Sequence, residues 1–236
     1  KRMESIGLMA SGVAHDLNNL LSGIINYPEL LLLELPQDSP LRTIVLRIKE
    51  SGQCAALVVD DLLTVAHGVA CSKTTLDLNE IITEYTHSPQ YDTLMSRYPH
   101  ITCEKKICDS PVYLSCSFVH LTKCIMNLVA NAAESIEGKG VVIISTFKKN
   151  IAYDPDRQTG GKYAILQVSD TGHGIPKESL GQIFEPFYTK KIMGRSGTGL
   201  GLSVVWNTME DHQGYVEVSS GENGSCFDLH FPLSED

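Results

Sequence analysis

A seven-residue repeat of apolar side chains, from about Met3 to Leu33, constrains the fold of this chain more than any other feature. The apolar residues fall at two positions of each heptad and form two seams along a helix. The seams consist of Ile6, Val13, Leu20 and Tyr27, and of Ala10, Leu17, Ile24 and Leu31. This spacing is typical of helices that pack against other helices, and it predicts a helix that does not lie on a sheet.

A second helix with the same repeat is predicted from about Leu41 to His67, after the turn-forming stretch Glu34–Pro40. Two such helices joined by a short connection form an antiparallel hairpin. One hairpin cannot bury two full seams, so we expect a homodimer in which two hairpins form a four-helix bundle. Pro28 lies inside the first helix, where the loss of a backbone hydrogen bond predicts a bend.

The pattern changes after about Cys71, where the heptads stop and short strand-like runs alternate with helical stretches. The strand-like runs are Val112–Leu114, Val141–Phe147, Ala164–Ser169, Tyr215–Ser219 and Phe227–Phe231, and the helices are Ser117–Glu137 and Leu200–His212. We interpret this order as an α/β sandwich whose mixed sheet is covered by helices on one face. The prediction is an α+β protein with a helical hairpin over residues 1–70 and a sandwich domain over residues 71–236.

The composition excludes some partners. A formal net charge of −9 leaves no basic stripe of the kind that nucleic acid requires, so we expect no nucleic-acid partner. The longest apolar run is only a few residues and no signal-peptide pattern opens the chain, so we expect a cytoplasmic fragment without membrane contact. The seven cysteines are scattered without a CxxC pair, which favours reduced thiols over a zinc site.

His15 is the first candidate for chemistry. It falls at an f position of the heptad, which directs it away from the seams, and Asp16 follows at once. A carboxylate there can hold the Nδ1–H of the imidazole and leave Nε2 free as a nucleophile. Asn19 lies one turn later on the same face, where its amide can orient a water or an incoming group. The alternative is an ordinary surface histidine without a function.

Asn127 and Asn131 lie four residues apart in an otherwise apolar helix, so both amides project from one face. Burying two amides together is costly unless something binds them. An oxygen-liganded Mg²⁺ that bridges to phosphates would explain the pair. The structural alternative is that the two amides hydrogen-bond each other or act as caps.

Asp170 ends a strand-like run, and Gly172 and Gly174 follow it closely. A carboxylate at a strand end can recognise the amino group of a base. The two glycines let the backbone come close to a flat ring. This motif is the candidate for the base-binding side of a nucleotide site.

A second glycine-rich segment opens the last predicted helix and consists of Gly197, Thr198, Gly199, Leu200 and Gly201. Its glycines allow close backbone approach, and the helix N-terminus offers unpaired N–H groups to phosphate. Lys190 or Lys191 can reach a triphosphate from the segment before it. The surrounding stretch, Pro176–Ser196, is predicted to be a lid. The polar stretch Lys148–Gly161 is predicted to be a hairpin loop.

In order and spacing, these segments resemble the H, N, G1, F and G2 boxes of sensor histidine kinases, with the F box at Phe184–Lys191. The resemblance runs from about Glu4 to Pro232. It implies a dimerisation and histidine-phosphotransfer hairpin over residues 1–70 and an ATP-binding domain of the gyrase, Hsp90 and MutL type over residues 71–236. It also implies ATP and Mg²⁺ as cofactors, a homodimer, and the receiver domain of a response regulator, separate or fused, as partner.

By this resemblance, His15 is the phosphoacceptor, Asp16 is the acidic residue beside it, and Asn19 is the position linked to dephosphorylation of the regulator. The H box departs from the commoner His-Glu-x-Arg form and is similar to a subgroup rich in hybrid kinases. The implied nucleotide-binding positions lie in the N, G1 and G2 boxes and the lid, with the two asparagines also as Mg²⁺ ligands: Asn127, Asn131, Asp170, Gly172, Gly174, Lys190, Gly197, Thr198, Gly199, Leu200 and Gly201.

Two other functions use the same kind of fold. A plain ATPase or nucleotide-driven clamp needs a base that activates water, and the ATPases that this chain resembles place a glutamate where it has Asn127. An amide cannot take a proton at neutral pH, which favours the kinase. A scaffold that only dimerises would not need the complete set of boxes. The sequence therefore predicts ATP-dependent phosphorylation of His15, followed by phosphoryl transfer to an aspartate of a regulator.

Overall fold

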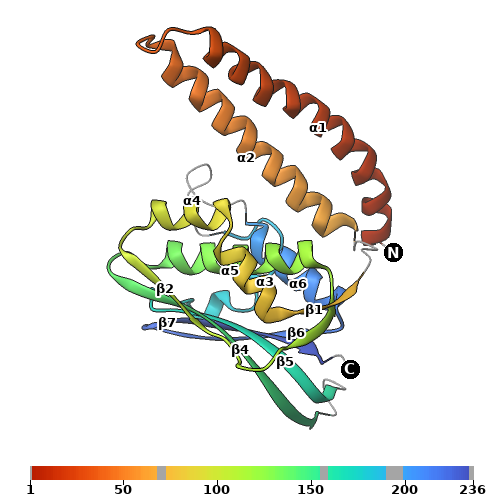
Figure 1. Cartoon of the computed structure of the whole chain (residues 1–236). Coiled ribbons are helices and arrows are strands. Elements are labelled where there is room, and N and C mark those ends of the chain that lie inside the picture. Colours follow the sequence, from red (N-terminus) through yellow and green to blue (C-terminus); the bar gives the residue numbers. More distant parts are fainter. Residues whose placement is uncertain (1, 68–72, 155–158, 190–198, 234–236) are drawn as a thin grey trace. The chain divides into compact units, whose positions relative to one another are not determined.

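The computed structural model describes residues 2–67, 73–154, 159–189 and 199–233 (Figure 1). Side chains are described over the same ranges except at residues 2–16, 18, 54, 57, 60–67, 154 and 159. The chain divides into two compact units, Lys1–Ala70 and Cys71–Asp236. Across the described ranges, every helix is too short or too polar to cross a membrane.

The first unit is a hairpin of two helices, α1 (Arg2–Glu34) and α2 (Leu41–His67). The helices approach closely at Gly52, where a Cβ would lie only 2.9 Å from Cγ2 of Ile24. Arg42 stabilises the connection, because its Nη1 donates hydrogen bonds to the carbonyls of Leu32, at 2.8 Å, and Leu35, at 2.9 Å. Helix α1 continues through Pro28, and the bend expected there stays a prediction.

The second unit contains a five-stranded mixed sheet with the order β2-β4-β5-β7-β6, in which only β2 and β4 are parallel. Its strands are β2 (Ile101–Lys106), β4 (Gly140–Asp154), β5 (Thr159–Asp170), β6 (Tyr215–Gly221) and β7 (Gly224–Pro232). A smaller antiparallel pair is formed by β1 (Thr74–Asp77) and β3 (Tyr113–Cys116). The helices α3 (Leu78–Thr86), α4 (Pro89–Arg97), α5 (Phe118–Ser135) and α6 (Gly201–Asp211) lie on one side of the sheet (Figure 1). The predicted fold class is confirmed.

Helix α5 forms the centre of this layer because its apolar residues recur at helical spacing. Seven of its side chains are buried, among them Leu121, Ile125 and Leu128. They pack with Leu166 of β5 and Leu229 of β7 in one core. Burial of each large aliphatic side chain contributes ~1.5–3 kcal/mol to stability. The core therefore fixes α5 on the sheet, and with it any polar side chain on the opposite face of the helix.

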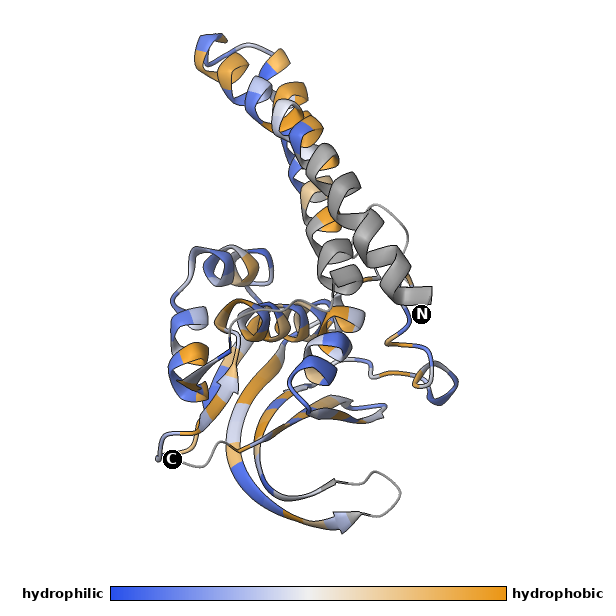
Figure 2. Cartoon of the chain, turned by 90° about the vertical axis from the view of Figure 1, so that its right-hand side faces the viewer, coloured by the Kyte–Doolittle hydropathy of each residue, from blue (hydrophilic) through white to orange (hydrophobic). Residues whose placement is uncertain are grey.

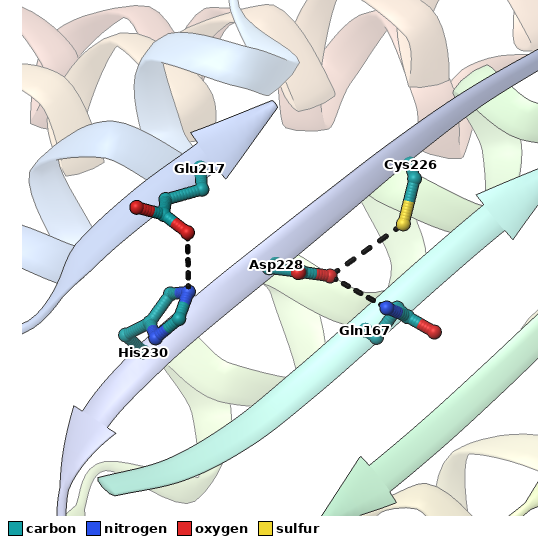
Figure 3. A network of polar contacts seen from close by, with 5 residues as sticks. All are labelled: Gln167, Glu217, Cys226, Asp228 and His230. Atoms are coloured by element: carbon teal, nitrogen blue, oxygen red, sulfur yellow. Dashed lines mark hydrogen bonds and ion pairs between the residues drawn. The ribbon is translucent and has the colours of Figure 1, made fainter. Parts of the chain in front are cut away.

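The face of the sheet turned away from the helices carries a polar network (Figure 3). Asp228 accepts a hydrogen bond from Nε2 of Gln167 at 2.9 Å, and the Cys226 thiol lies 3.5 Å from the same carboxylate. Nε2 of His230 lies 3.4 Å from Oε2 of Glu217. Successive residues of a strand point to opposite faces, so Cys226, Asp228 and His230 of β7 share one face of the sheet, while the apolar residues between them point into the core.

The prediction of a loop over Lys148–Gly161 is wrong for most of this stretch. Strand β4 runs to Asp154 and β5 begins at Thr159, so only residues 155–158 separate the two strands. Polar residues that look like a loop are paired here, for example Asn150 with Lys162. The end of such a ribbon is solvated, and its residues do not need to alternate between apolar and polar. The helices predicted over Ser117–Glu137 and Leu200–His212 are present as α5 and α6.

Candidate nucleotide-binding site

Asp170 stands at the end of β5, where its carboxylate is held from one side. Its Oδ1 accepts a hydrogen bond from the backbone N–H of Gly172 at 2.7 Å. The hydroxyl of Ser135 lies 3.0 Å from the same oxygen and 2.8 Å from the Ala132 carbonyl, so its one hydrogen is shared between them. Both bonds that join this carboxylate to described residues use Oδ1. Oδ2 is therefore the atom available to a donor on a ligand.

Ser135 is a site residue that the sequence analysis missed. It lies on α5 four residues after Asn131, which itself lies four residues after Asn127, so the three polar residues share one helix face. Besides touching Asp170, Ser135 accepts a hydrogen bond at its carbonyl from the N–H of His173 at 3.2 Å. The spacing of the three polar residues was the sequence signal that could have identified Ser135. Ser135 links the loop after β5 to the end of α5.

Gly172 and Gly174 are required by close contacts in this loop. A Cβ on Gly172 would overlap the hydroxyl of Ser135. Gly174 has φ of 71°, the left-handed region, and a Cβ there would overlap the carbonyl oxygen of Gly221. The turn between β6 and β7 thus supports the loop from behind. Ser220 adds to this support, because its Oγ accepts a hydrogen bond from the N–H of Ile175 at 2.7 Å.

Asn127 lies against the first residue of α6. A Cβ on Gly201 would be 3.2 Å from Oδ1 of Asn127, so no larger residue fits there without displacing the amide. Nδ2 of Asn127 is buried and has no hydrogen-bond partner among the described residues. Such an orphaned amide is costly, and a bound ligand would satisfy it. Asn131, one turn further along α5, is half-buried.

The start of α6 is held by an unusual backbone pairing. Gly199 has φ of 71°, and a Cβ there would come within 2.9 Å of Cα of Phe187. The Gly199 carbonyl accepts a hydrogen bond from the N–H of Phe187 at 2.9 Å, and Phe187 itself has φ of 66°. Leu200 is the N-cap residue and is fully buried, and its own side chain makes no capping hydrogen bond. The N-cap side chain therefore does not serve as an acceptor for the first N–H groups of α6.

The structure places two groups of predicted residues at two points along α5. Asp170, Gly172 and Gly174 lie at its C-terminal end, and Gly201 meets Asn127 near its middle. Asn127 and Ser135 are eight residues apart, or ~12 Å at the rise of an α-helix. This separation suits a ligand with a flat base at one end and phosphates at the other.

Other predicted residues are not placed by the structure. Lys190, Gly197 and Thr198 lie outside the described residues. His15 and Asp16 belong to α1, but their side chains lie outside the description, so the outward direction of His15 stays a prediction. Asn19 is exposed on α1. The first part of the stretch expected as a lid packs into the unit, since Ser179 is 2% and Ile183 8% exposed.

Comparison with known families matches both units. Residues 5–68 match the His Kinase A (phospho-acceptor) domain. Residues 117–235 match the histidine kinase-, DNA gyrase B- and HSP90-like ATPase family.

Similar sequences are sensor kinases. Sensor kinase CckA of Brucella abortus (strain 2308) is 30% identical over 243 residues, which cover 98% of this chain and 25% of that protein. Sporulation kinase C of Bacillus subtilis (strain 168) is 29% identical over 231 residues, which cover 97% of this chain and 49% of that protein. The chain thus spans between a quarter and a half of the length of these relatives.

Solved structures share the fold. Full-length ShkA in complex with AMPPNP superposes with a TM-score of 0.75 at 21% identity, covering 98% of this chain and 46% of that one. The catalytic domain of histidine kinase ThkA, in a nucleotide-free form, gives a TM-score of 0.56 at 26% identity, covering 69% of this chain and 97% of that one. With both family matches, and a candidate nucleotide site formed by residues of β5, α5 and α6, the chain belongs to the sensor histidine kinases and represents their catalytic core.

Proposed function

We propose that this chain uses Mg-ATP to phosphorylate His15 and then passes the phosphoryl group to an aspartate in the receiver domain of a response regulator. The observation that carries the proposal is the Asp170 carboxylate, fixed through Oδ1 with Oδ2 left for a ligand. The direct test is whether γ-labelled ATP labels His15 and whether added regulator removes that label. A kinase that uses ATP and a response regulator works in the cytoplasm, and we place the chain there.

Adenine recognition is assigned to the loop after β5. The exocyclic amino group of adenine is a donor, and Oδ2 of Asp170 is an acceptor at the edge of the loop. Gly172 and Gly174 keep this loop free of side chains, so the flat ring can lie against the backbone. A base that presents a carbonyl at the same position would face the carboxylate with another acceptor. Asp170 therefore favours adenine over guanine.

The phosphates are assigned to the start of α6. The N–H groups of the first helical turn and the positive end of the helix dipole favour an anion there. The buried amide of Asn127 faces the same place. A side-chain amide offers an oxygen for Mg²⁺ and two N–H donors for phosphate, so Asn127 fits either ligand. Asn131 is the second candidate ligand. Bound Mg²⁺ would neutralise part of the charge on the phosphates.

Phosphorylation of His15 needs a neutral imidazole with its lone pair on Nε2. The Nε2–P bond forms while the bond between the γ-phosphorus and the bridging oxygen breaks, and ADP leaves with that electron pair. Asp16 would accept the Nδ1–H and support the positive charge that develops on the ring. The carboxylate of a receiver aspartate then attacks the same phosphorus, and neutral His15 is regenerated.

The hairpin supports homodimerisation because a single copy leaves apolar residues in solvent. Figure 2 shows hydrophobic residues along the described part of both helices. The most exposed in α1 are Leu33 at 83%, Tyr27 at 69% and Leu20 at 68%. Together with the heptad pattern, this exposure favours a four-helix bundle formed by two copies.

A charge in the seam should break this dimer. Leu20 occupies a heptad seam position and is 68% exposed in one copy, so Leu20→Glu should leave the hairpin itself largely intact. In the dimer the carboxylate would be buried without a partner in both copies, and we expect the dissociation constant to rise about tenfold or more. Light scattering at micromolar concentration measures the mass. Thr43→Glu, an exposed outer position on α2, is the matched control. An unmutated chain that is monomeric at this concentration would refute the bundle.

Asn19 is assigned a role separate from that of His15. An uncharged amide cannot carry the phosphoryl group, yet it can hold a water in line with an aspartyl phosphate on a docked regulator. Asn19→Ala should keep autophosphorylation near normal and selectively lower dephosphorylation of the regulator. Both activities are assayed on one preparation with the cognate regulator. Equal loss of both would indicate general positioning, and an unchanged phosphatase activity would remove Asn19 from the mechanism.

A further inference from the structure

His212 joins the two helices that carry the phosphate site. It is the C-cap residue of α6, and its Nδ1 lies 2.7 Å from the Thr208 carbonyl in the last turn of that helix. Its Nε2 lies 3.0 Å from the backbone nitrogen of Ser117, the N-cap residue of α5. The imidazole is 7% exposed and packs edge-on against Phe231, with ring centroids 6.1 Å apart.

These two bonds determine the protonation state of the ring. The Ser117 amide can only donate, so Nε2 must be the acceptor and carry no hydrogen. Nδ1 then carries the proton and donates it to the Thr208 carbonyl. A proton added to Nε2 would face the N–H of Ser117, donor against donor. We call the connection of α6 to α5 through these two hydrogen bonds of His212 the joint. The joint forms only while His212 is neutral.

The position of the joint allows it to influence the orientation of α6, and with it the candidate phosphate site. Helices α5 and α6 pack side by side, and two of their contacts lie far apart along this packing, where Asn127 meets Gly201 and where Ser117 meets His212. The two contacts are ten positions apart along α5 and eleven positions apart along α6, so the helices run side by side over ~15 Å. Buried side chains of α6 hold the middle of the helix in place. The hydrogen bond between His212 and Ser117 adds a directional restraint at the C-terminal end of α6, which helps to set the direction in which its N-terminus points.

We propose that His212 is a positioning residue that holds the phosphate-binding end of α6 against Asn127, and that its protonation releases this hold. The inference rests on the proposed ATP site. It adds a residue outside that site which acts through the backbone of α5 and α6.

Charged groups around His212 bear on its titration. Burial is the main cause that lowers the pKa of His212, and Lys73 and His120 add to the effect, while the Thr208 carbonyl and Asp211 oppose it. Lys73 also donates a hydrogen bond to the carbonyl of Asp211, next to the joint. A histidine whose pKa is lower in the folded state adds stability above its ordinary pKa. That contribution is lost as pH falls from ~6.5 through the lowered value.

The test uses three variants of the full chain. His212→Gln places an amide oxygen where Nε2 accepts, and the amide cannot be protonated. His212→Phe keeps the ring volume and leaves the Ser117 N–H unpaired. His87→Gln is the matched control, because His87 is the C-cap residue of α3 and contacts the Thr83 carbonyl through Nδ1 at 2.7 Å, yet its ring is exposed.

Two measurements are made on each variant. Calorimetry gives the ATP dissociation constant at pH values of about 7.5 and 5.5, on either side of the ordinary histidine pKa. Fluorescence of Trp206, the single tryptophan of the chain, reports on α6 without nucleotide. Trp206 lies on that helix, and the centroid of its ring is 5.1 Å from that of Phe184. The second measurement does not depend on ATP binding.

We expect His212→Phe to weaken ATP binding about tenfold at the higher pH, because a buried donor is left unpaired. His212→Gln should bind within about twofold of the unmutated chain there and should lose its acid dependence. His87→Gln should behave as the unmutated chain. Folded His212→Phe with normal affinity, or His212→Gln with full acid dependence, would overturn the proposal. If the unmutated chain binds no ATP, the proposed function fails, but Trp206 fluorescence still tests the joint. A change in fluorescence between the two pH values that is lost in His212→Gln would support the joint, and the same change in both proteins would contradict it.

Discussion

Incubation with γ-labelled ATP is expected to give an acid-labile, alkali-stable phosphoryl adduct, and His15→Gln is expected to abolish it. Both properties are those of a phosphorus–nitrogen bond to an imidazole. Glutamine has nearly the length of histidine, but its amide nitrogen has no free lone pair and cannot attack phosphorus. Since His15 lies in the first unit and the candidate nucleotide site in the second, ATP affinity should not change.

The controls separate loss of the acceptor from loss of the fold. His87→Gln removes an exposed histidine of the second unit and should keep full labelling. Calorimetry on His15→Gln should give the ATP affinity of the unmutated chain. Label that persists on His15→Gln would mean that another residue accepts the phosphoryl group, and the assignment of His15 would be wrong.

Periodicity predicted α5 and α6 but not α3, although α3 also buries apolar side chains at helical spacing. Helices α5 and α6 lie within two residues of their expected bounds, because each packs one face onto a single sheet. Helix α4 was not predicted either, since it is only nine residues long and its apolar residues, such as Tyr91 and Leu94, are only partly buried. Its start had a local signal that was not used. Ser88 caps the helix by accepting from the N–H of Tyr91 at 3.2 Å, and Pro89 follows at the first helical position.

The candidate site was predicted where a motif is contiguous in the sequence. Asp170, Gly172 and Gly174 were predicted because a strand end and two glycines stand together. Contacts made by distant segments were not predictable in this way. Gly224 is one such residue, with φ of 125° and no room for a Cβ beside the Asp170 carbonyl. A turn glycine in the sequence does not reveal which loop it supports, because strand pairing between β5 and β7 decides that.

Asp170→Asn is expected to weaken ATP binding by ~1–3 kcal/mol, or roughly five- to 150-fold, the usual cost of an unpaired buried polar group. The N–H of Gly172, 2.7 Å from Oδ1, fixes the orientation of the new amide with its oxygen toward the backbone. The amide nitrogen then replaces Oδ2 and faces the amino group of adenine, donor against donor. The loop itself keeps its hydrogen bond, so the melting temperature should change little.

The same variant should change the preference between bases, which damage to the fold would not do. Guanine presents a carbonyl where adenine presents its amino group, so an amide nitrogen at this position attracts guanine and a carboxylate repels it. Calorimetry with ATP and GTP on both proteins measures the ratio of affinities, which should move toward GTP in Asp170→Asn. Asp228→Asn is the matched control, because Asp228 lies on the outer face of the sheet and bonds to Gln167 (Figure 3). Unchanged ATP affinity in Asp170→Asn would show that Asp170 does not contact the base.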